Sequence, residues 1–124
     1  MDNKLKSFAI QTLRRASYRW YGRYNALKKA SIGRNQYTCA LCPPGTIHPR
    51  KGVQIDHKDP VVDPIIGWTN FDDFITRMFV SEEGFQILCL ECHKSKTTSE
   101  NTTRKANKVK NKLTKPRKKS KIKE

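Results

Sequence analysis

Hydrophobic residues recur at helical spacing near the start of the chain. Leu5, Phe8, Ala9, Leu13, Ala16 and Trp20 are separated mostly by three or four positions, which predicts an amphipathic helix. A second short helix is predicted at about residues 25–31 and would end at Gly33, because glycine suits the left-handed position after a helix. We predict that the aromatic side chains of this segment pack against the rest of the domain, with stacking on nucleic-acid bases as the alternative. These residues are Tyr18, Trp20, Tyr21 and Tyr24.

The middle of the chain changes to a strand pattern. "GVQIDH" at residues 52–57 alternates and is rich in β-branched residues, and "GFQIL" at residues 84–88 is its predicted partner strand. Between them, Phe71, Phe74, Ile75 and Met78 have helical spacing, which predicts an inserted helix that caps the core. "ECHKSKT" at residues 91–97 should open a further helix.

Three regions follow from these patterns, and together they predict a small α+β fold. Residues 1–36 form a basic helical segment, residues 37–103 form the central domain, and residues 104–124 form a tail. The tail has few sizeable apolar residues among eleven basic ones, so it is predicted to be disordered. The whole chain has 124 residues and 35% hydrophobic content. A core of this size usually needs a covalent or metal staple.

The four cysteines suggest what that staple is. They form two Cys-x-x-Cys pairs, Cys39 with Cys42 and Cys89 with Cys92, and this spacing is typical of a closed tetrahedral site for structural Zn²⁺. The first twenty residues contain no apolar run of a signal peptide or membrane span. We therefore expect a reducing, cytoplasmic environment and a metal. Two disulfides in a secreted protein are the alternative.

Charge is distributed unevenly along the chain. Residues 1–38 carry nine Lys/Arg against one acid, residues 39–103 carry six against nine acids, and residues 104–124 carry eleven against one acid, within a total of +15. Two basic arms flanking an acidic middle predict a polyanionic partner. Nucleic acid is favoured over an anionic membrane, because no segment has the clean apolar face of an interfacial helix. The expected contact residues are Arg14, Arg15, Arg19, Lys94 and Lys96.

One aspartate and two histidines are candidates for chemistry. Asp56 and His57 are adjacent in a predicted strand, so their side chains point to opposite faces. His93 directly follows Cys92, and on a helix it is rotated about 100° away from the zinc face. Asp56 and His93 would then meet and hold a second, hydrated divalent ion. Each residue alone is more often a surface residue than a ligand, and His48 is interpreted as a loop residue.

The order of these features, from the first cysteine pair through Asp56-His57 and the second strand to Cys92-His93, resembles the HNH endonucleases. The resemblance covers residues 13–97, including the leader "LRRASYRWYGRYNALKKA", which is similar to that of small phage-encoded HNH proteins. It implies a ββα-metal fold held by a four-cysteine zinc. His57 would be the general base, and Asp56 and His93 would be ligands of a catalytic Mg²⁺ or Mn²⁺ ion on the scissile phosphate. The sequence departs from the family where the middle Asn would stand, because Gly84 occupies that position.

These observations predict a metal-dependent DNA endonuclease or nickase acting on duplex DNA in a host cytoplasm. Asn70 is the candidate replacement for the family Asn that orients the base. The main alternative is a zinc-stapled nucleic-acid-binding module without catalysis, and Gly84 favours it. A ribosome-associated zinc protein is supported only by the basic tail.

Overall fold

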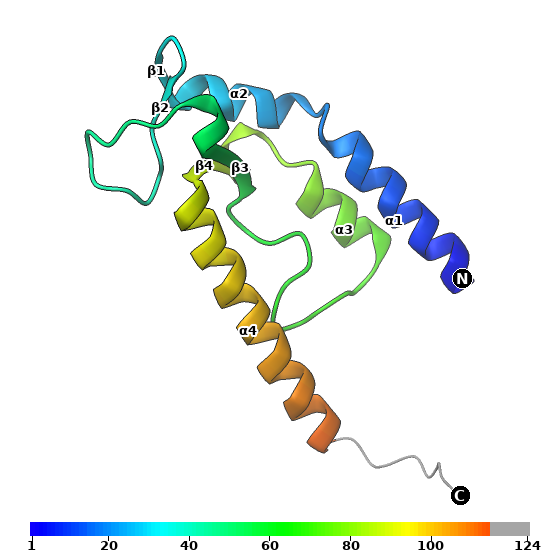
Figure 1. The fold of residues 1–124 in the computed structure, drawn as a ribbon. Helices are drawn as coiled ribbons and strands as arrows, with labels where there is room; N and C mark the ends of the chain where they lie inside the picture. The colour runs from blue at the N-terminus through cyan, green and yellow to red at the C-terminus, as the bar shows by residue number, and fades with distance from the viewer. Residues whose placement is uncertain (115–124) are drawn as a thin grey trace, which may run out of the picture.

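The computed structural model describes residues 1–114, with side chains described through Lys108. Two helices, α1 (Asn3–Ser17) and α2 (Tyr21–Ala30), precede a short antiparallel pair, β1 (Ser31–Gly33) and β2 (Gln36–Tyr37). The remaining elements are η1 (Arg50–Gly52), β3 (Val53–His57), α3 (Phe71–Met78), η2 (Glu82–Gly84), β4 (Phe85–Cys89) and α4 (Leu90–Thr114). The chain is thus a small mixed fold of helices and two small sheets (Figure 1).

The hairpin of β3 and β4 is the centre of the fold. The two strands are antiparallel, with Val53 opposite Cys89 and His57 opposite Phe85. Both strands lie within one residue of their predicted positions. Since α4 begins directly after β4 (Figure 1), the hairpin and the first turn of α4 hold Asp56, His57 and His93 close together.

The hydrophobic core joins α2 and the preceding Trp20 to this hairpin. Ala26 of α2 is buried together with Val53, Phe85 and Ile87 of the two strands, and Trp20 packs against the same cluster. Gly22 permits this approach, because a Cβ atom there would lie 2.6 Å from the carbonyl oxygen of Val80. The Trp20 indole N–H donates a hydrogen bond to that same carbonyl. The N-terminal segment therefore shares one core with the central hairpin.

Two predictions for the N-terminal segment were wrong. Gly33 is part of β1 and does not terminate a helix, because the chain is already extended at Ser31. Tyr18, Tyr21 and Tyr24 are 72%, 53% and 62% exposed, so of the four aromatic residues only Trp20 packs in the core. The side of this segment that faces the core is occupied by Trp20, Ala26 and Leu27, and the three tyrosines lie on the outer surface.

The inserted helix α3 is confirmed. Asn70 caps its N-terminus, and the Asn70 side-chain oxygen accepts a hydrogen bond of 2.7 Å from the Asp73 amide. Phe74 and Met78 are buried, 2% exposed each. Ile75, which was predicted on the same face, is 41% exposed, so only part of the predicted apolar face packs inward.

The predicted disorder from residue 104 was wrong for the first part of the tail. Helix α4 continues through Thr114, because no glycine or proline interrupts the sequence from Leu90 to that point. Tertiary contacts hold it: the Arg104 guanidinium donates to the Val62 carbonyl at 2.8 Å, and Asn107 donates to the Ile65 carbonyl. The rest of the predicted tail, residues 115–124, lies outside the described residues. No helix in the described part has the length and apolar character needed to span a membrane.

Candidate functional site

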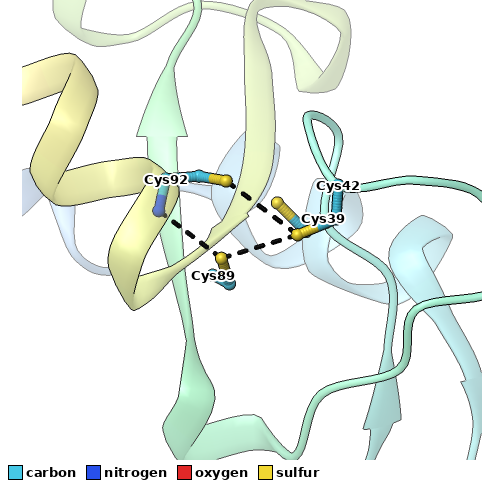
Figure 2. Close-up of side chains that lie close together, drawn as sticks. All are labelled: Cys39, Cys42, Cys89 and Cys92. Atoms are coloured by element: carbon cyan, nitrogen blue, oxygen red, sulfur yellow. Dashed lines mark hydrogen bonds between the residues drawn. The ribbon is translucent and has the colours of Figure 1, made fainter.

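The four cysteines converge at one end of the β3–β4 hairpin. Cys39 and Cys42 come from the loop after β2, Cys89 ends β4 and Cys92 lies in the first turn of α4 (Figure 2). All four sulfur atoms lie within 4.8 Å of one another. The Cys42 sulfur is 3.7 Å from that of Cys89 and 3.9 Å from that of Cys92. Tetrahedral zinc with Zn–S bonds of about 2.3 Å separates its sulfurs by about 3.8 Å, so the cluster fits such an ion.

Binding of a metal ion would displace the thiol protons of this cluster. Without one, the neighbouring Cys39 thiol and burial raise the pKa of Cys42 to about 11. A divalent ion would lower the pKa of the thiols that bind it, because its charge stabilises the thiolates. His48 lies beside the cluster, with its Nε2 atom 3.6 Å from the Cys42 sulfur. It belongs to the loop as predicted, where it forms an isolated bridge with Tyr37.

A separate cavity of about 530 Å³ contains the other candidate residues. The cavity is bordered by β3, by α4, and by the segment in which α1 ends and α2 begins. Asp56, His57 and His93 all line it. Its remaining basic lining residues are Arg14, Arg23, Lys96 and Arg104. The predicted convergence of one aspartate and two histidines is therefore present in the structure, in a basic surrounding.

Asp56 is the most enclosed member of this group, with its side chain 11% exposed. Its two carboxylate oxygens have different partners. Oδ2 accepts a hydrogen bond of 2.9 Å from Gln86 on the paired strand and lies 3.2 Å from the Lys96 ammonium. Oδ1 faces His93, at 3.8 Å from its Nε2 atom. Two ligands of one divalent ion, each at about 2.1 Å, lie between about 3 and 4 Å apart, so Oδ1 and Nε2 fit a shared ion.

His57 is held by the main chain. Its Nε2 atom lies 2.8 Å from the Met78 carbonyl oxygen, and its ring contacts Phe85 with centroids 4.6 Å apart. A carbonyl oxygen only accepts, so Nε2 carries the proton and the neutral ring keeps its lone pair on Nδ1. Burial is the largest influence on this ring and lowers the pKa of His57. The imidazole is therefore neutral at neutral pH.

The predicted role of Asn70 in orienting His57 was wrong. The Asn70 side-chain oxygen is used to cap α3, while the last turn of the same helix supplies the Met78 carbonyl to His57. Gly84 is explained by packing: a Cβ atom there would lie 2.4 Å from Cγ2 of Val80. An asparagine has the same Cβ, so the family residue does not fit in this arrangement.

The predicted nucleic-acid contact residues fall into two groups. Arg14, Arg15, Arg19 and Lys94 are exposed, and Arg14 is at the edge of the cavity. Lys96 is instead engaged inside it, bound to Asp56, to the carbonyl oxygen of His57 at 3.2 Å and to Glu100. Glu100 is four residues further along α4, a spacing that could have indicated this ion pair from the sequence.

Three groups at the site were missed in the sequence. The Met78 carbonyl and the Gln86 amide left no signal, because neither a main-chain acceptor nor a single glutamine is distinctive. Arg23 was not among the predicted contact residues. Comparison of the chain with models of protein families, with characterised proteins and with solved structures found no match.

Proposed function

We propose that this protein is a metal-dependent HNH nuclease that hydrolyses phosphodiester bonds of duplex DNA. The observation that carries the proposal is the joint placement of Asp56, His57 and His93 on one basic cavity. The antiparallel strands β3 and β4 followed by α4 are consistent with a ββα-metal core. The four-cysteine cluster supports this assignment as a structural zinc site, since its closed thiolate shell leaves no position open for substrate.

His57 would act as the general base. With Nε2–H donated to the Met78 carbonyl, the Nδ1 lone pair is the atom available to accept a proton from the attacking water. Burial keeps the ring neutral by lowering its pKa, which supports the base at neutral pH. The carbonyl fixes the orientation of the ring and stabilises the imidazolium after the proton has moved.

Asp56 and His93 would hold the divalent ion through Oδ1 and Nε2. Such an ion, Mg²⁺ or Mn²⁺, supplies charge neutralisation at the phosphate and at the leaving oxygen. Gln86 orients the carboxylate by donating to its other oxygen. Four exposed basic residues are suited to contact DNA phosphates: Arg14 and Arg15 of α1, Arg19 just after this helix, and Lys94 of α4.

A binding module without catalysis is the second candidate. The observation that favours it is the ion pair of Lys96 with Asp56, since an ammonium group already neutralises the carboxylate that would hold the catalytic ion. In that case the zinc cluster and the basic surface would hold nucleic acid, and Asp56 and His57 would be structural.

Relaxation of supercoiled plasmid separates the two candidates. The purified protein should nick or linearise the plasmid with Mg²⁺ or Mn²⁺ but not with EDTA, and should regain activity when excess Mg²⁺ is restored. His57→Ala should lose most cleavage while DNA affinity is unchanged. The zinc content of the same variant is the control and should be unchanged, because His57 is not part of the four-cysteine cluster. Binding without cleavage under every divalent ion would favour the binding module.

A further inference from the structure

Arg23 is a basic residue of the cavity that contacts aromatic rings. It lies on α2 and lines the same cavity as His57. Its guanidinium lies over the Tyr18 ring, 5.0 Å from the centroid, and 5.8 Å from the centroid of Phe85. The His57 ring contacts the same Phe85 ring, so one aromatic side chain positions both the arginine and the imidazole.

No acidic group balances this charge. Within residues 1–108, whose side chains the structure describes, Arg23 forms no ion pair and its guanidinium has no hydrogen-bond acceptor. Burial lowers the pKa of Arg23, with Tyr18 raising it and the neighbouring positive charge of Arg50 lowering it further. The other partly buried arginines differ: Arg77 donates to the Pro60 carbonyl, and Arg104 donates to the Val62 carbonyl.

A partly buried cation without an acceptor in the protein is left to water or to a ligand, and a ligand of opposite charge is favoured. Stacking on Tyr18 satisfies the face of the guanidinium but leaves its N–H donors, which lie in the plane of the group, free for another partner. The planar fork of an arginine matches two oxygens of a phosphate. Arg23 lines the same cavity as Asp56 and His93, so a phosphate bound by Arg23 would lie near the reacting groups.

We propose that Arg23 binds a phosphate group inside the cavity, next to His57, and that Tyr18 and Phe85 hold its guanidinium in position for this. The identity of the ligand as a nucleic-acid phosphate rests on the proposed function. Phosphate binding by itself does not depend on cleavage. Helices α1 and α2 would then contribute directly to the substrate site, through Arg23 and the Tyr18 ring beneath it.

The test uses inorganic phosphate as the probe and the zinc-loaded full chain without added Mg²⁺ or Mn²⁺. Phosphate is titrated while the NMR signals of the His57 imidazole are followed. In the unaltered protein these signals should shift and saturate. Arg23→Met should weaken the apparent affinity roughly tenfold or more, as expected for loss of charged hydrogen bonds. Arg23→Lys, which keeps the charge but not the fork, should fall between.

Arg34→Met is the matched control, because Arg34 is exposed, lies between β1 and β2 and does not line the cavity. Its phosphate affinity should stay within about twofold of the unaltered protein, as expected for a screened surface charge. The proposal is overturned if the His57 signals show no saturable shift, or if Arg34→Met and Arg23→Met weaken binding equally. If Arg23→Met does not fold, the comparison of Arg23→Lys with Arg34→Met decides in the same way. Saturable binding without plasmid cleavage would refute the nuclease and leave the phosphate site standing.

Discussion

Replacing Gly84 by alanine should destabilise the protein, although glycine-to-alanine changes often stabilise. The added Cβ atom would lie 2.4 Å from Cγ2 and 2.7 Å from Cβ of Val80, closer than such atoms approach in proteins. Val80 is packed against the core, so its movement disturbs the core as well. Overpacking of this kind costs about 1–3 kcal/mol. The reduced entropy of the unfolded chain offsets about 0.4–1 kcal/mol of this, which leaves a net loss of about 1–2 kcal/mol.

Urea unfolding at saturating zinc measures this loss. Zinc must be held constant, because a ligand of the folded state raises the apparent stability. For a slope of about 2 kcal/mol per molar urea, the midpoint should fall by about 0.5–1 M. Gly33→Ala is the control: the atom nearest to its added Cβ is the end of the flexible Gln36 side chain, so its midpoint should change little.

The change should also affect the site. Val80 follows Met78 by two residues, so displacement of Val80 moves the carbonyl that accepts the His57 hydrogen bond. We therefore expect Gly84→Ala, and more strongly Gly84→Asn, to perturb the NMR signals of the His57 ring. An unchanged or raised midpoint for Gly84→Ala would show that Val80 gives way freely, and the packing explanation of the glycine would be refuted.

Four further predictions follow from the two sites and the tail. Cys92→Ser should lose bound zinc and the cooperative unfolding transition, because metal binding and folding are coupled in small modules; a sharp transition in zinc-free protein would contradict this. Asp56→Asn should weaken Mn²⁺ binding measured by calorimetry while zinc content stays constant, and unchanged Mn²⁺ affinity would remove Asp56 from the ligand set. The His57 ring should titrate below pH 6.5, because burial lowers the pKa of His57. Its contribution to stability is thus present above pH 6.5 and is lost as pH falls through the folded pKa, which NMR and urea unfolding at several pH values would check. Deleting residues 115–124 should reduce the salt dependence of DNA affinity, by about 0.9 in log–log slope for each lost phosphate contact, without changing the cleavage pattern.

Much of the scaffold could be predicted from the sequence, because the relevant signals are local. The alternating pattern at residues 52–57 identified β3, residues 84–88 were identified as its partner β4, and helical spacing identified α3, with Phe74 and Met78 buried. The two Cys-x-x-Cys pairs indicated a metal cluster, since each pair presents two sulfurs from one short turn. The uneven distribution of charge along the chain could also be determined from the sequence. Each of these properties depends on residues a few positions apart.

The partners of the functional side chains could only be determined from the tertiary structure. The His57 ring is hydrogen-bonded to the carbonyl of Met78, 21 residues away. Every residue has a main-chain carbonyl, so the sequence alone does not show which one accepts this hydrogen bond. Arg23 lines the cavity because α2 packs against Phe85. The tyrosines of the same segment, which were predicted to pack against the domain, are exposed. The length of α4 was underestimated because composition alone does not include the long-range hydrogen bonds of Arg104 and Asn107. Local periodicity selects which face of an element turns inward, whereas the contacts across the cavity depend on how the elements pack together, and that packing is a property of the whole chain.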